Sequence, residues 1–346
     1  MTSNSPKLAE ETIDVEVEAA IIDEILNHNS ALMDLDPDMR RAQHPKHHGL
    51  AQAVFRVKDG IPDNLARGIF SNCGEFKALI RFSNGQQKDD RKPDAHGMAI
   101  KLLDVPGEPG DWFLPDPVHP SSFDFLLVDH PVMFAKTLAQ YRAASEFIHD
   151  VEEIKAGCGG WFRDKIEGAL QAAEAGELVL EGGLRLLLRM KRFASHEMRS
   201  PLDARYWSQT PYLLGAGQAV KYMVRPEDGG TGASVPKEGE DMLAAALAKG
   251  LEGGPVRFVF GVHVQDDPVE DPIEDATVPW WAEEIDPGGA GSMNELAEIE
   301  IEGLQPDGAE GIAFSPWNVT ADHKPLGGIN RVRGKVYGDL AKRRRP

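Results

Sequence analysis

The sequence contains only two cysteines, Cys73 and Cys158, among its 346 residues. Two cysteines cannot build a disulfide framework, and neither lies in a CxxC or another metal-binding spacing. The start of the chain has no basic and apolar leader, and no run approaches the roughly 20 apolar residues that span a bilayer. We therefore expect a soluble, cytoplasmic protein with ordinary thiols and no membrane span.

Basic residues are scarce in most of the chain. There are 37 Lys and Arg against 56 Asp and Glu, which gives a formal net charge of -19. A negative surface repels the phosphates of nucleic acids, so we expect no nucleic-acid partner. The exception is the segment 330–346, which carries seven Lys or Arg and one acid.

Common cofactor-binding motifs are missing, since there is no GxGxxG after a strand pattern, no P-loop and no HExxH. Residues 9–30 are acidic, with apolar positions at helical spacing, and predict a helical arm over residues 1–40. Short β-branched segments such as KALIRFSN predict strands from about residue 50, helix formers return at 132–200, and strands follow. This order predicts an α+β fold: an antiparallel sheet or barrel over 41–346 with a helical insertion.

Two groups of candidate functional residues lie in the first half of the chain. His44, His47 and His48 precede a predicted strand, although a cluster of loop histidines is more often solvated than functional. Arg81 and Ser83 alternate with apolar residues in LIRFSNG and share one face of a strand. A charge on such a strand is either exposed or paired with an anion, because burying it unpaired costs too much.

The third group lies in the basic end. On a helix, Arg333 and Tyr337 are one turn apart on one face, and Arg344 is on nearly the same face. A guanidinium beside a phenol lowers the pKa of the phenol and favours the phenolate, which binds a hard ferric ion. The alternative is a solvated basic helix end that complements the helix dipole.

Taken together, these segments resemble the haem catalases, and more closely the short catalase-related haem proteins that lack a C-terminal extension. LIRFSN is similar to a VRFST-type strand of that family, DAHGMAIKLL to its DPRGFAVKFY-type segment, and DFLLVDHPVMF to its DLVGNNTPVFF-type loop. His48, followed seven residues later by Phe55, resembles the family's distal-histidine strand. FSPWNVTADHKPLGGINRVRGKVY ends in the RxxxY of its proximal helix, and the resemblance covers roughly residues 40–345.

The resemblance implies an eight-stranded antiparallel β-barrel with surrounding helices that binds haem b. Tyr337 would be the proximal ligand of the iron, and Arg333 would keep its phenol anionic. Arg81 and Arg344 would pair with the two haem propionates. The basic end of the chain would thus point partly into the protein.

On the distal side, the resemblance implies that His48 acts as acid and base and that Ser83 orients its ring. Asp129 would be the third catalytic residue, and it stands where the family has an asparagine. An ionised carboxyl cannot donate a hydrogen bond to peroxide, whereas a buried and protonated one can.

One expected arginine is missing from this alignment. The family usually has a propionate-binding arginine three residues before its distal histidine, where this chain has Pro45. His44, Lys46 and His47 are the candidate substitutes.

We therefore expect a haem peroxidase that reduces hydrogen peroxide or organic hydroperoxides with small organic donors, with weak catalase activity at most. One alternative is a fatty acid hydroperoxide-rearranging enzyme of the allene oxide synthase or lyase type, although such relatives tend to carry threonine at the position of His48. Another is a non-catalytic haem-binding scaffold. A homodimer is the assembly that we expect.

Overall fold

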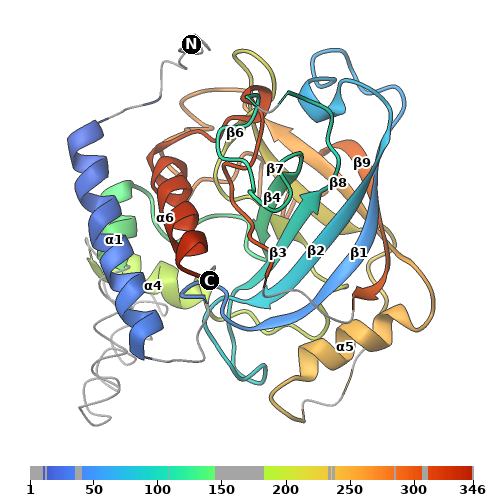
Figure 1. Ribbon diagram of the computed structural model, residues 1–346, viewed down its shortest axis with the longest axis horizontal. Helices are drawn as coiled ribbons and strands as arrows, with labels where there is room; N and C mark the ends of the chain where they lie inside the picture. Colours follow the sequence, from blue (N-terminus) through green and yellow to red (C-terminus); the bar gives the residue numbers. More distant parts are fainter. Residues whose placement is uncertain are drawn as a thin grey trace.

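A computed structural model gives the protein a β-barrel with helices packed outside it (Figure 1). The structure describes residues 11, 14–35, 41–108, 110–144, 183–232, 235, 238–283, 286–305 and 311–344.

Eight antiparallel strands close into a ring. One sheet has the order β5-β4-β3-β2-β1-β9-β8-β7-β6, and β5 also pairs with β7, which closes the ring and leaves the short β6 outside it. The prediction of an α+β fold with an eight-stranded antiparallel barrel is confirmed. The strands are β1 (His47–Val57), β2 (Glu75–Asn84), β3 (His96–Leu102), β4 (Phe123–Val128), β5 (Tyr206–Trp207), β6 (Tyr212–Leu213), β7 (Ala219–Pro226), β8 (Val256–Val264) and β9 (Asn294–Gln305).

Aromatic side chains fill the inside of the barrel. The ring of Phe260 lies 5.2 Å from the ring of Phe55 and 4.6 Å from the ring of Phe125, measured between centroids. An eight-stranded barrel is only wide enough for its own side chains to fill, or for one small ligand. Because side chains occupy this interior, a large ligand has to bind outside the ring.

Strand β2 shows how the alternation of side chains separates core from site. Ile80 and Phe82 point into the barrel core and are fully buried. Arg81 and Ser83 therefore lie on the outer face, as their spacing predicted. Both are nevertheless buried, with 3% of each residue exposed, so other elements must cover this face.

Helices α1 (Val15–Leu35) and α6 (Gly328–Arg344) lie side by side outside the barrel (Figure 1). Ile21 and Ile25 of α1 pack against Val332, Val336 and Leu340 of α6. Further helices are α4 (Gly183–Phe193), α5 (Met242–Leu251), which packs on β1, and the 3-10 turns η1 (Gly68–Phe70) and η2 (Ala321–His323).

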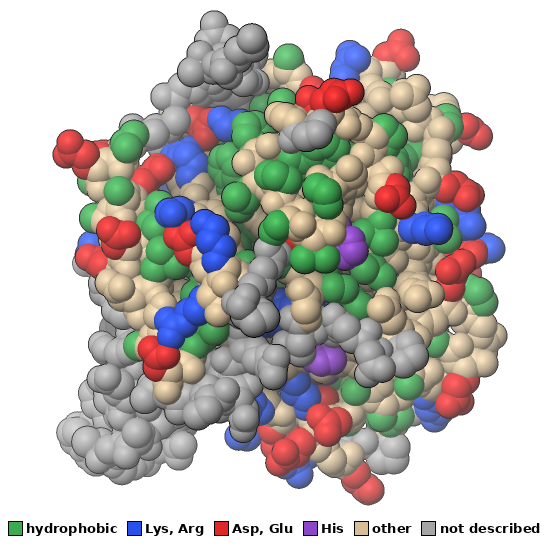
Figure 2. Space-filling view, viewed as in Figure 1, with side chains coloured by type: hydrophobic (Ala, Val, Ile, Leu, Met, Phe, Trp, Pro, Cys, Tyr) green, Lys and Arg blue, Asp and Glu red, His purple; other side chains and the backbone are tan. Residues whose placement is uncertain are grey.

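The charges of the chain ends are complementary. Figure 2 shows Lys and Arg side chains gathered over α6, beside acidic side chains of α1. Arg331 pairs with Glu18 at 2.6 Å and with Glu11 at 2.5 Å, and Arg343 pairs with Asp34. Part of the basic end is therefore neutralised by acids near the N-terminus of the same chain.

The predicted arm and insertion are described only in part. Helix α1 lies within the predicted arm, 1–40, while the boundary at residue 40 stays a prediction. Of the insertion predicted at 132–200, residues 138–144 and α4 are helical, and residues 145–182 lie outside the described part of the chain. No helix among the described residues is long and apolar enough to cross a bilayer.

Candidate functional site

A pocket lies between α6 and the outer face of β2, β3 and β4. It has about 730 Å³ of empty volume, including space open to solvent. Arg81 and Ser83 line it from β2, Met98 from β3, and Arg333 and Tyr337 from α6. Four of the predicted site residues, Arg81, Ser83, Arg333 and Tyr337, thus come together in one pocket.

Helix α6 enters this position because it docks closely on Trp317. A Cβ atom on Gly334 would meet the Trp317 ring, whose nearest atom would be 2.4 Å away. The indole nitrogen of Trp317 donates to the carbonyl oxygen of Asn330 at 2.7 Å. This close approach turns Arg333 and Tyr337 toward the outer barrel wall.

Arg333 and Tyr337 are neighbours, as the RxxxY spacing predicted. The guanidinium carbon of Arg333 lies 5.7 Å from the centroid of the Tyr337 ring. Burial lowers the pKa of Arg333, but the phenols of Tyr337, Tyr212 and Tyr141 outweigh burial and raise it above its usual value. A permanent cation therefore stands beside the Tyr337 phenol. Arg333 also donates to the hydroxyl of Thr210 at 3.0 Å.

Three arginines line the pocket, and none of its described lining residues is acidic. They are Arg41, Arg81 and Arg333. Arg81 donates to the carbonyl oxygen of His44 at 2.9 Å, and Arg41 donates to that of Ile312 at 2.7 Å. Three guanidinium groups gathered on the wall of one pocket make it suited to an anionic ligand.

His44 lies in the pocket beside Ser83. Its Nδ1 atom is 3.0 Å from the Ser83 hydroxyl oxygen. Burial, followed by the charges of Arg81 and Arg333, lowers the pKa of His44 to about 3. The ring is therefore neutral near pH 7 and can accept a proton.

His48 is not among the residues that line the pocket. Its Nε2 atom is 2.9 Å from Oδ1 of Asn84, and its Nδ1 atom is 3.8 Å from a carboxylate oxygen of Asp90. The acid-base role assigned to His48 stays a prediction, but the structure gives the place beside Ser83 to His44.

His48 was assigned from its spacing to Phe55 in the family resemblance, whereas two backbone irregularities bring His44 to Ser83. His44 has a left-handed backbone with φ of 53°, and the register between β1 and β2 shifts between His47 and Gly49. The sequence did contain a signal for His44. Arg41 stands three residues before it, which is the spacing expected for a propionate-binding arginine and its distal histidine.

Asp129 faces away from the pocket. Its Oδ1 atom accepts a hydrogen bond from the backbone N–H of His96, and Oδ2 lies 2.7 Å and 2.6 Å from the Nδ1 atoms of His96 and His196. Burial alone would raise the pKa of Asp129, but these hydrogen bonds outweigh burial and hold it at about 2. The carboxyl is ionised, and its neighbour Val128 lines the pocket instead.

Arg344, the remaining predicted cofactor residue, is the last residue of α6. Its side chain lies outside the described part of the structure. Its pairing with a propionate stays a prediction.

Comparison with solved structures shows that the chain has the catalase fold. A bacterial catalase matches with a TM-score of 0.62 and 15% identity, over 99% of this chain and 64% of that one. A fungal catalase matches with a TM-score of 0.61 and 14% identity, over 91% of this chain and 61% of that one. Catalase A from Saccharomyces cerevisiae matches with a TM-score of 0.59 and 15% identity, over 91% of this chain and 63% of that one. The chain thus spans less than two thirds of the length of these catalases.

At this level of identity the likeness establishes the fold and nothing finer. No protein-family model matches the chain, and no curated protein matches it. An assignment of chemistry therefore has to come from the pocket itself.

Proposed function

We propose that this protein is a haem-dependent peroxidase that reduces hydrogen peroxide or organic hydroperoxides with small organic donors. The observation that carries the proposal is the meeting of Tyr337, its neighbour Arg333, and His44 with Ser83 in one pocket. The catalase fold supports it independently.

The residues of the pocket fit haem b. Tyr337 offers an oxygen ligand for the iron, and Arg41 and Arg81 offer cations for two propionates. Leu126 and Phe314, which pack near Tyr337, offer apolar surface for the macrocycle. Haem bound there would supply the redox-active iron on which a peroxide O–O bond is cleaved.

Arg333 would hold Tyr337 in the form that binds iron. A fully charged guanidinium beside a phenol favours loss of the phenolic proton. Because Arg333 is buried and anchored by Thr210, its charge stays beside Tyr337 rather than in solvent.

His44 would move the proton of the peroxide. With Nδ1–H donated to Ser83, the Nε2 atom keeps a lone pair that takes the proton from one peroxide oxygen and gives it to the leaving oxygen. Ser83 fixes the ring through this hydrogen bond and so acts as a positioning residue.

The turn after β4 favours peroxidase over catalase chemistry. Asp129 stands where related haem proteins carry an asparagine. Its carboxyl is ionised and forms hydrogen bonds with His96 and His196. Val128 beside it offers the pocket no hydrogen-bond donor. A second peroxide molecule would therefore find no hydrogen-bond donor on this turn. A small organic electron donor does not need that hydrogen bond.

The test is the absorption spectrum of the protein expressed with ample haem, for wild type and Tyr337→Phe. We expect a ferric tyrosinate-type spectrum in the wild type and its loss in Tyr337→Phe. The matched control is Tyr141→Phe, which removes another phenol near Arg333 that does not line the pocket. An unchanged spectrum in Tyr337→Phe would exclude it as the ligand.

Substrate assays then separate the possible activities. Oxidation of a phenolic donor on addition of peroxide, without oxygen release, supports the proposal. Oxygen release would instead indicate a catalase, and loss of a fatty acid hydroperoxide without a donor would indicate a rearranging enzyme. Bound haem with none of these reactions would indicate a scaffold.

A further inference from the structure

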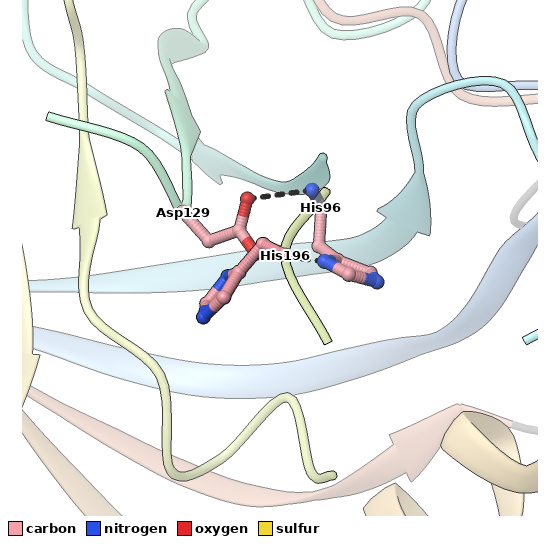
Figure 3. Close-up of side chains that lie close together, drawn as sticks. All are labelled: His96, Asp129 and His196. Atoms are coloured by element: carbon pink, nitrogen blue, oxygen red, sulfur yellow. Dashed lines mark hydrogen bonds and ion pairs between the residues drawn. The ribbon is translucent and has the colours of Figure 1, made fainter. Parts of the chain in front are cut away.

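Three side chains from distant parts of the chain meet outside the pocket (Figure 3). His96 is the first residue of β3, Asp129 directly follows β4, and His196 lies after α4. One ligand atom from each lies within 4.8 Å of the other two. Two imidazole nitrogens and a carboxylate oxygen are a ligand set that divalent transition metals prefer.

The distances between these atoms are close to those of a coordination site. Oδ2 of Asp129 is 2.7 Å from Nδ1 of His96 and 2.6 Å from Nδ1 of His196. Ligand atoms around a tetrahedral zinc ion are roughly 3.3 Å apart, because each lies about 2.0–2.2 Å from the metal. A small outward movement of the two rings would therefore admit the ion.

The three ligands are held in place by backbone hydrogen bonds. The backbone N–H of His96 donates to Oδ1 of Asp129 at 2.7 Å, which leaves Oδ2 for the metal. The N–H of Asp129 donates to the carbonyl oxygen of His96, and the N–H of Asp94 donates to that of His196. Such supporting contacts orient metal ligands and sharpen their affinity.

An ion has both a reason to bind and a route to the site. The side chain of Asp129 is 1% exposed, and a carboxylate attracts a divalent cation more strongly away from solvent. The side chain of His196 is 50% exposed, so a metal can enter from solvent past this ring. Three protein ligands leave one coordination position for water.

We propose that His96, Asp129 and His196 form a site for a divalent transition-metal ion such as Zn²⁺, separate from the haem pocket. The ion replaces the two hydrogen bonds from the imidazoles to the carboxylate and ties residue 196 to the ends of β3 and β4. Val128 and Gly97, which line the pocket, are the chain neighbours of two of the ligands, so the ion also stiffens one pocket wall. The site does not depend on whether haem is bound.

The experiment is a zinc titration of the purified full chain against a chromophoric chelator, for wild type, His196→Ala and His119→Ala. We expect one zinc per wild-type chain and, because a ligand is lost, binding more than about tenfold weaker in His196→Ala. His119→Ala is the matched control, since this histidine lies outside the cluster, and it should bind zinc as the wild type does.

A second readout reports the ligand set and guards against misfolding. Cobalt added to the wild type should give the visible absorption of a four-coordinate site, and zinc should raise the unfolding temperature of the wild type but not of His196→Ala. The proposal is overturned if the wild type binds no zinc, or if His196→Ala binds it as tightly. The cluster would then be a hydrogen-bonded group of two imidazoles and one carboxylate that binds no metal.

Discussion

The Nδ1 atom of His44 lies 3.0 Å from the hydroxyl oxygen of Ser83, on the wall of the same pocket that holds Tyr337. This contact joins a left-handed residue before β1 to the outer face of β2. It fixes the orientation of a neutral imidazole in a pocket that a phenol and three arginines also line.

Replacing His44 and His48 separately tests which histidine moves the proton. We expect His44→Ala to slow peroxide consumption by about 10² to 10⁴, because that is the usual contribution of a positioned acid-base group. His48→Gln should stay within a few-fold of the wild type, since His48 hydrogen-bonds Asn84 and does not line the pocket. The measurement is the initial rate of peroxide loss in haem-loaded protein. The reverse pattern would restore His48 as the catalytic residue.

Gly97→Ala should displace His44 without removing it. A Cβ atom at this position would lie 2.7 Å from Cε1 of His44 and 2.9 Å from Oγ of Ser83, closer than such atoms approach. We expect a loss of about 10² in turnover, as a displacement of 1 Å can cause, with the haem spectrum largely retained. Gly74→Ala is the control, because nothing lies within 4 Å of its added Cβ. Equal rates in both variants would contradict the prediction.

Acid should destabilise the fold through its buried histidines. Burial lowers the pKa of His323 and, together with Arg81 and Arg333, that of His44 to about 3, below the ordinary value of 6.5. Because the unfolded chain takes up protons first, stability is full above pH 6.5 and falls as the pH drops toward 3. Each such histidine costs about 1.4 kcal/mol per pH unit in that interval.

Urea unfolding at pH 7 and pH 5 measures this effect. We expect a lower free energy of unfolding at pH 5, and a smaller drop in His323→Asn, which lacks one of these histidines. Equal stability of the wild type at the two pH values would show that the histidines are not held neutral.

Arg331→Gln should loosen the contact between α1 and α6. Its side chain is 12% exposed and pairs with Glu11 and Glu18. We expect a loss of about 1–3 kcal/mol in the free energy of unfolding, because Glu18 loses the cation that it pairs with and Glu11 keeps only Lys324, at 3.7 Å. Lys342→Gln, on an exposed side chain of the same helix, should change stability by less than about 1 kcal/mol. Similar values for the two variants in urea unfolding would mean that the arm contributes little.

The sequence by itself determined the alternation of the strands and the turn of the last helix. Period two placed Arg81 and Ser83 opposite Ile80 and Phe82, and helical period placed Arg333 beside Tyr337. Both predictions need only local geometry, because side chains two apart on a strand, or four apart on a helix, share a face whatever surrounds them. The fold class followed from the same patterns and from the resemblance that they carry.

Only the tertiary structure decided what depends on contacts between distant segments. The left-handed turn at His44 and the shifted register after His47 bring His44 rather than His48 to Ser83. Asp129 turns to His96 and His196 because a buried carboxylate needs donors, and these come from β3 and from a residue 67 positions away. These contacts depend on which segments the closed barrel brings together. A local pattern in the sequence therefore cannot predict them.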